Sequence, residues 1–305
     1  MNEVLINRLR SFGNKSIGFI LFVICLLAIY NKVLHNENLN QYSADLKIQL
    51  TKISLLEWGV LLILFLCNYL VEAIKWKYLL ASWHPISMIQ SFKSVLVGQS
   101  FAFFTPARSG DYVGRILWLP SGSKMKGVAQ MAWSSYSQLL ITVGIGSVAL
   151  FFNLPFLPWL KWVAPIITVG ALWVYFHPGY FKGWLKKLNT FQIDNTLKIK
   201  LLILSLFKYM IFVVQYTWVV NMFHIPISFF DLWVALGVLF LALSIIPVIS
   251  ITELVIRGQL IVLLLEPWYN NSLMLICVST IIWLVNLLLP AIIGAILLLK
   301  FRLKQ

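Results

Sequence analysis

Two short stretches, TPARSGDYVGR at 105–115 and IPVISITELVIRG at 246–258, determine how the rest of this chain is interpreted. Each contains a helix-breaking proline, an acid five or six residues after it, and an arginine four residues beyond the acid. Both lie in otherwise apolar surroundings. Ionisable groups are costly at membrane depth and usually face a cavity or each other there, so these stretches are the first candidates for a functional site.

The composition around these stretches is that of an integral membrane protein. Of the 305 residues, 60% are hydrophobic, 11% are charged and 13 are tryptophan, and the mean hydropathy is +0.88. One soluble domain of this length cannot bury so much apolar surface. We therefore predict an all-α polytopic membrane protein that forms a single membrane domain over residues 1–305.

Six apolar runs are long enough to cross a hydrocarbon core of about 30 Å as helices of about 20 residues. They lie near 16–34, 53–74, 128–152, 159–177, 201–223 and 272–299. The first run follows Arg8, Arg10 and Lys15, as in a secretory signal. No small-residue cleavage site follows it, so we predict that it is retained as a membrane span.

Two further segments, 86–120 and 231–266, are apolar but interrupted in the middle. At 1.5 Å per residue, the return arm from Asp111 covers about 14 Å and the return arm from Glu253 about 20 Å, so neither arm crosses the bilayer. We predict that both segments are re-entrant hairpins of broken helix. The predicted helix-breaking residues are Pro106, Gly110 and Pro247. The alternative is eight conventional spans whose prolines only kink continuous helices, which membrane helices tolerate.

This arrangement places most of the 24 lysines and arginines on one side of the membrane. Loops on the cytoplasmic side are enriched in these residues, so we expect a multi-pass protein of a bacterial inner membrane with both termini in the cytoplasm. The net charge of +14 then reflects orientation and contact with anionic lipid, and it does not require nucleic acid as a partner. The two hairpins enter from opposite sides, so the two halves of the chain are inverted repeats.

Inverted repeats with broken helices that meet near the midplane are typical of transporters. In that architecture the N-termini of half-helices present N–H groups and a positive dipole end to anionic groups of the substrate. Arg108, together with helix N-termini near Asp111 and Glu253, would suit a phosphate. The two acids are also candidates for carrying a coupling proton.

The chain also resembles a known family, on the segment GQSFAFFTPARSGDYVGR at 98–115 and on IPVISITELVIRG at 246–258. The family is the flippase-like membrane domain found at the N-terminus of lysylphosphatidylglycerol synthases and in related free-standing membrane proteins. The order of spans is similar along nearly the whole chain. The resemblance implies translocation of a lipid. We expect no soluble synthase domain, so aminoacyl transfer to lipid is not implied.

The predicted substrate-binding residues are Arg108, Asp111, Arg115, Glu253 and Arg257. A simpler explanation exists for four of them, because an acid followed four residues later by an arginine stabilises an ordinary helix. Glu72 lies near the end of the second span, and we expect it to snorkel or to pair with Lys75 on the cytoplasmic side. The lysines from Lys182 to Lys200 are expected in a solvated loop that meets anionic headgroups.

Motifs for an enzyme or a bound cofactor are missing from the sequence. The three cysteines are odd in number and have no CxxC spacing, and the chain contains neither a DDxxD run nor a GxxxxGK[ST] loop. We therefore expect no metal, no cofactor and no catalytic residues. The predicted function is movement of a phospholipid or lipid-linked phosphate between leaflets. The alternatives are a non-transporting membrane scaffold and a membrane enzyme acting on a lipid-linked substrate.

Overall fold

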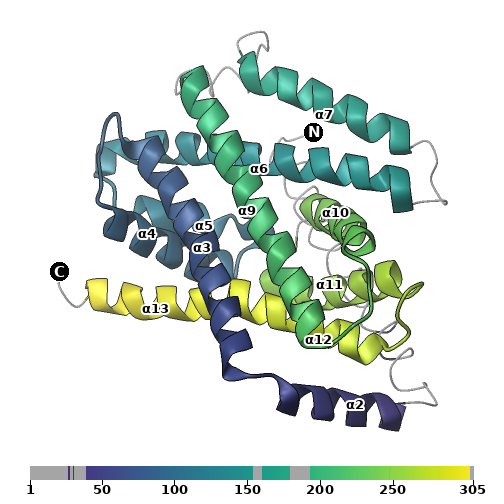
Figure 1. Ribbon diagram of the computed structural model, residues 1–305. Coiled ribbons are helices and arrows are strands. Elements are labelled where there is room, and N and C mark those ends of the chain that lie inside the picture. Colours follow the sequence, from purple (N-terminus) through teal and green to yellow (C-terminus); the bar gives the residue numbers. More distant parts are fainter. Residues whose placement is uncertain are drawn as a thin grey trace, which may run out of the picture.

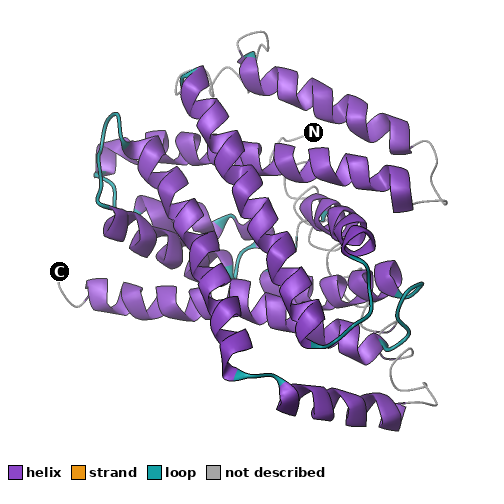
Figure 2. Cartoon of the chain, in the orientation of Figure 1, coloured by secondary structure: helices purple, strands orange, loops and turns teal. Residues whose placement is uncertain are grey.

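The structure is a computed structural model that describes residues 27, 30, 39–153, 160–178, 193–246 and 248–302. Within these ranges the chain is built of helices and contains no strand (Figure 2). The prediction of an all-α fold is confirmed. Pro247 and all but two residues of the predicted span near 16–34 lie outside the described residues.

Three described helical stretches are long and apolar enough to cross a membrane. The first is α3 (Leu55–Leu80) and the second consists mainly of α6 (Lys124–Asn153). The third is a continuous run of α12 (Ser272–Trp283), a π-helical turn (Leu284–Leu288) and α13 (Leu289–Arg302). These helices fit a membrane protein, while the count of six spans and two re-entrant hairpins stays a prediction.

The helices begin where polar side chains satisfy the first backbone N–H groups. At the start of α3, the Ser54 hydroxyl accepts from the Glu57 N–H while the Glu57 carboxylate accepts from the Ser54 N–H, which is a capping box. The Asp194 carboxylate accepts from the Leu197 N–H at the start of α9 (Asn195–Met222). The remaining single helices are α2 (Leu39–Lys52) and α7 (Leu160–Phe176).

Helices α3 and α9 lie side by side and cross over α6 and the run from α12 to α13 (Figure 1). Two apolar cores form around this crossing. One includes the buried side chains of Tyr216 and Ile282, and the other includes those of Trp76 and Tyr175. Val285 packs against both cores, so the π-helical turn lies where they meet.

Each predicted hairpin segment contains two helices separated by a break. In 86–120 the helices are α4 (Met88–Ala102) and the seven-residue α5 (Gly110–Ile116), with a 3-10 turn (Pro106–Arg108) between them. In 231–266 they are α10 (Phe229–Ile245) and α11 (Ser250–Leu265). The breaks therefore fall where the sequence predicts them, and both return arms are short.

The two breaks touch each other. The Ala107 N–H donates a hydrogen bond of 3.2 Å to the carbonyl oxygen of Val248. Ala107 and Arg108 have φ angles of 50° and 56°, in the left-handed region that side chains other than glycine rarely adopt. Segments about 140 residues apart in sequence are thus joined at their tips, and Arg108 is one of the two residues in the strained backbone of the first tip.

Close glycine packing holds the first hairpin against its neighbours. A methyl group added to Gly294 of α13 would overlap the backbone carbonyl of Leu96 in α4, and one added to Gly114 of α5 would overlap the backbone at Gly98. These helices approach so closely only because glycine has no Cβ. The position of the hairpin therefore depends on backbone contact with α13.

We expect Gly294→Ala to lower the free energy of unfolding by about 1–3 kcal/mol, because α13 and α4 must separate to admit the added methyl group. Gly59→Ala is the control, since Gly59 lies within α3 and has open space where its Cβ would be. That control should be neutral or slightly stabilising, because alanine favours a helix more than glycine does. Unfolding by titration with a denaturing detergent measures both variants. Equal stability of the two would contradict the packing described.

Candidate functional site

A cavity of about 430 Å³ lies where the two hairpin tips meet α3, α6 and α9. Five of its lining residues are large and apolar, namely Leu139, Phe212, Leu243, Ile246 and Val248. Most of the other lining residues are polar or charged. The principal ones are Asn68, Glu72 and Lys75 from α3, Gln99, Arg108, Asp111 and Arg115 from the first hairpin, Ser134, Ser135, Gln138 and Thr142 from α6, Lys208 from α9, Glu253 from α11, and Asn286.

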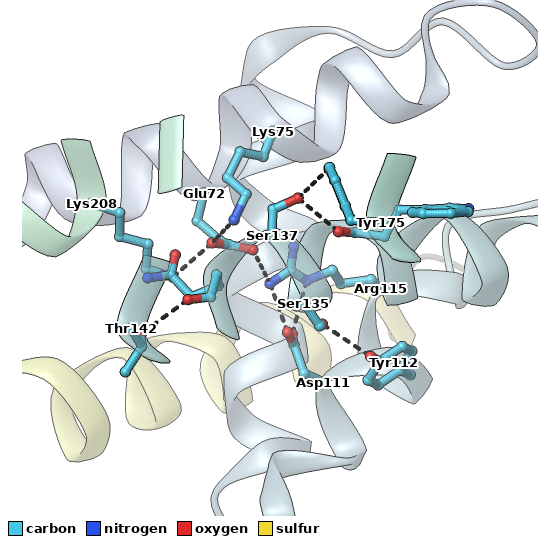
Figure 3. Close-up of polar contacts among 12 residues, drawn as sticks. Glu72, Lys75, Asp111, Tyr112, Arg115, Ser135, Ser137, Thr142, Tyr175 and Lys208 are labelled. Atoms are coloured by element: carbon cyan, nitrogen blue, oxygen red, sulfur yellow. Dashed lines mark hydrogen bonds and ion pairs between the residues drawn. The ribbon is translucent and has the colours of Figure 1, made fainter. Parts of the chain in front are cut away.

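Glu72 is the centre of the charged part of this wall (Figure 3). Its carboxylate lies 2.6 Å from the Lys208 Nζ, 3.0 Å from the Arg115 Nη2 and 3.7 Å from the Lys75 Nζ. Glu72 is only 8% exposed. One buried acid therefore holds three cations that come from α3, from α5 and from α9.

Arg115 is held on two sides. Besides Glu72, it donates to both oxygens of Asp111, from Nε at 2.8 Å and from Nη2 at 2.6 Å. A paired arrangement of this kind fixes the plane of the guanidinium group as well as its position. Gly98 makes room for it, because a Cβ there would overlap a carboxylate oxygen of Asp111.

For Glu72, the expected pairing with Lys75 is confirmed, and the expected snorkelling to the surface is wrong. Lys75 does pair with Glu72, but it is 1% exposed and lies inside the helix bundle. The reason is that α4 packs over this end of α3, where the buried Ser91 hydroxyl donates to the Ala73 carbonyl. Both side chains are therefore buried among the helices.

The expectation of a solvated loop was also wrong for Lys198. Its side chain is buried, with the ammonium group 4.9 Å from the centre of the Trp133 ring. A cation over the face of an aromatic ring keeps an electrostatic partner when it loses water. Lys200, on the same helix, is exposed.

Arg108 differs from the other cations of the cavity. Its Nη2 donates a hydrogen bond of 2.7 Å to the side-chain oxygen of Gln99, and none of the ion pairs among the described residues includes it. Its neighbour is thus a neutral amide. This arginine keeps donor groups for a ligand that enters the cavity.

The second hairpin contributes a separate buried pair. Glu253 lines the cavity and accepts from the Arg257 guanidinium, which also donates to the Tyr216 hydroxyl at 3.1 Å. Both charged residues are less than 10% exposed. Arg257 lies behind Glu253 and is not part of the cavity wall. Its role in the structure is to hold Glu253 against α9.

The π-helical turn brings a further amide into the site. In a π-helix the backbone bonds skip one residue further than in an α-helix, and such turns are common at functional sites. Here the Asn286 carbonyl accepts from the Tyr69 hydroxyl at 2.7 Å, and its side chain accepts from the Asn68 amide at 3.3 Å. The turn therefore joins the C-terminal helix to α3 at the cavity.

The structure brings four of the five predicted substrate-binding residues to one cavity. These are Arg108, Asp111, Arg115 and Glu253. Pro106 and Gly110 lie at the first hairpin tip as predicted, and Pro247 is outside the described residues. Sequence reasoning missed the contribution of Glu72, Lys75, Lys208, Asn68 and Asn286.

The described residues contain no group of three or more His, Cys, Asp or Glu side chains that could hold a metal ion. No protein-family model matches the chain, and no match was found among curated proteins.

Proposed function

We propose that this chain is a membrane transporter that moves a phosphate-bearing lipid or lipid-linked intermediate between the leaflets of a bilayer. The observation that carries the proposal is the cavity at the meeting point of the two hairpin tips, which is lined by both cationic and apolar side chains. A lipid headgroup and the start of its chain have this combination of properties. We further propose that both termini lie in the cytoplasm and that the membrane is a bacterial inner membrane.

The charges of the cavity favour an anion. Its wall and the pair behind it contain five cations (Lys75, Arg108, Arg115, Lys208 and Arg257) and three acids (Glu72, Asp111 and Glu253). At ordinary protonation this leaves an excess of two positive charges among the described groups. Uncompensated charge away from water is costly. A phosphate bound in the cavity would compensate the excess positive charge and would accept hydrogen bonds from the cations.

The apolar lining residues favour a lipid over a soluble anion as the ligand. Leu139 lines the cavity and is 43% exposed, and Ile245, next to the lining residue Ile246, is 70% exposed. Apolar side chains therefore occur both in the cavity wall and on the outer surface close to it. In a bilayer such a surface faces hydrocarbon, where an acyl or prenyl chain can remain while its headgroup enters.

The acids have a positioning role in this proposal. Asp111 and Glu72 hold Arg115, and Glu253 holds Arg257, so each tip keeps its shape when the cavity is empty. The pairing also limits the net charge that the empty protein buries. Asp111 and Glu253 remain our candidates for coupling to a proton.

The test is lipid movement in proteoliposomes that contain fluorescent phosphatidic acid, phosphatidylglycerol or a polyprenyl phosphate. We expect the wild type to move at least one of them, and we expect Arg108→Ala to slow that movement at least tenfold, because a charge-assisted hydrogen bond contributes about 1.5–3 kcal/mol. The fold should survive, since Arg108 has only Gln99 as a hydrogen-bonding partner among the described side chains.

Lys77→Ala serves as the control, because Lys77 is an exposed cation on α3 outside the cavity. It should leave the rate unchanged. A wild type that moves none of these lipids, with or without a proton gradient, would favour the alternative of a non-transporting scaffold.

A further inference from the structure

We propose that the site selects a phosphate group with two negative charges, as on a lipid phosphate monoester or diphosphate, and that Lys208 and Arg108 bind it. This inference rests on the proposed function and assigns the substrate class within it. It goes beyond a general preference for phosphate, because most membrane phospholipids carry a phosphodiester with only one negative charge.

The acids of the site are fewer than its cations. Arg115 is shared by Asp111 and Glu72, and Arg257 is held by Glu253. Lys75 and Lys208 then share the negative charge of Glu72 that Arg115 does not compensate. The cations in excess are therefore one lysine of this pair and Arg108, and a dianion would compensate both.

Of the two lysines, Lys208 is the more accessible to a ligand. The side chain of Lys75 is 1% exposed and lies 3.7 Å from Glu72. The side chain of Lys208 is 21% exposed and comes from α9, while Arg108 comes from the first hairpin. Lys208 can turn toward a ligand without uncovering a buried group. When it does so, Glu72 keeps Lys75 and Arg115 as partners, so the carboxylate is not left unpaired.

A phosphate group needs several hydrogen-bond donors. A phosphate monoester has three terminal oxygens and a charge of about −1.5 to −2 at neutral pH. Arg108 offers a planar fork of N–H groups and Lys208 a compact ammonium group, and both line the same cavity. Methylation of the phosphate removes one charge and one terminal oxygen, and a zwitterionic headgroup adds an ammonium group that this cationic wall would repel.

The experiment compares two ligands that differ by one methyl group, dioleoyl phosphatidic acid and dioleoyl phosphatidylmethanol. Their binding to the purified full chain in lipid nanodiscs is measured at pH 7.5 by competition with a fluorescent phosphatidic acid. We expect the monoester to bind about tenfold or more tightly than its methyl ester, as one additional charge-assisted contact implies. Equal affinity for the two lipids would overturn the proposal.

Variants test whether Lys208 causes the preference for the monoester. Lys208→Gln should abolish the difference between the two lipids, and Lys208→Arg should retain it. Lys200→Gln, an exposed lysine on the same helix, should behave like the wild type. A preference that persists in Lys208→Gln would overturn the role of Lys208. The Lys208→Arg variant keeps the test valid even if Lys208→Gln proves too unstable to purify.

Two further arms separate the sources of phosphate and the two proposals. Inorganic phosphate at the lipid concentration should not displace phosphatidic acid, and displacement would overturn a lipid-borne ligand. Equal movement of both lipids in proteoliposomes would leave the transport proposal standing and overturn this selectivity. Selective binding without movement would support the selectivity and contradict transport.

Discussion

Glu72→Gln is expected to lower the free energy of unfolding by about 3–5 kcal/mol, one of the two largest effects of a single substitution that we predict. The change keeps the shape of the side chain but removes the charge that holds three cations. Lys75 and Arg115 are almost completely buried, so they cannot turn to water for compensation. Unfolding of the purified protein by titration with a denaturing detergent measures the loss.

Glu57→Gln is the matched control, because it makes the same substitution on the same helix. Glu57 closes the capping box at the start of α3, and glutamine can take that role as well. Its cost should stay below about 1 kcal/mol. The double variant Glu72→Gln with Lys208→Gln should recover part of the loss, since it removes one of the cations left without an acid. A stability of Glu72→Gln equal to that of Glu57→Gln would contradict the arrangement around Glu72.

The second large effect is expected at the other hairpin. Glu253→Gln and Arg257→Gln should each cost about 3–5 kcal/mol, because each leaves its buried partner uncompensated. The combination of both changes should be clearly more stable than the sum of the single effects predicts, since two neutral amides can hydrogen-bond to each other and to Tyr216.

Additive losses would show that the two residues do not depend on each other. Transport by the double variant distinguishes their roles. If the pair only holds the tip, a folded double variant should move lipid at a rate within a few fold of the wild type. A well-folded but inactive double variant would instead assign Glu253 or Arg257 a direct part in substrate movement.

The sequence located both hairpin tips because proline and paired charges are rare within apolar runs. Pro106 starts the 3-10 turn that follows the end of α4 at Ala102, and the acid four residues before each arginine forms the ion pair that this spacing allows. These are local signals. The prediction of two breaks therefore needed no knowledge of how distant segments pack.

The role of Glu72 could not be predicted from such local signals, because its surroundings come from segments far away in sequence. Near the end of a long helix, a carboxylate can snorkel to the interface at little cost. Packing of α4 and α9 prevents this. One signal did exist: Asn68, Glu72 and Lys75 are spaced by four and three residues, so they share one face of α3.

Two other polar residues of the cavity, Lys208 and Asn286, differ in how clearly the sequence indicates them. Lys208 interrupts an apolar run in the middle of α9, and an isolated lysine at such a position indicates a buried partner. Asn286 had no comparable signal. Its place in the cavity depends on the π-helical turn at Leu284–Leu288. In that turn the Tyr69 hydroxyl donates a hydrogen bond to the backbone carbonyl of Asn286, which is a tertiary contact.

The cavity between the hairpin tips should hold a phosphate-bearing lipid, and native mass spectrometry of the protein purified in mild detergent tests this most directly. The wild type should retain a lipid whose fragmentation releases phosphate. The double variant Arg108→Ala with Lys208→Gln should lose that lipid, while Lys77→Ala with Lys200→Gln should keep it. A wild type that retains no such lipid, or retains it equally in all three proteins, would contradict the claim.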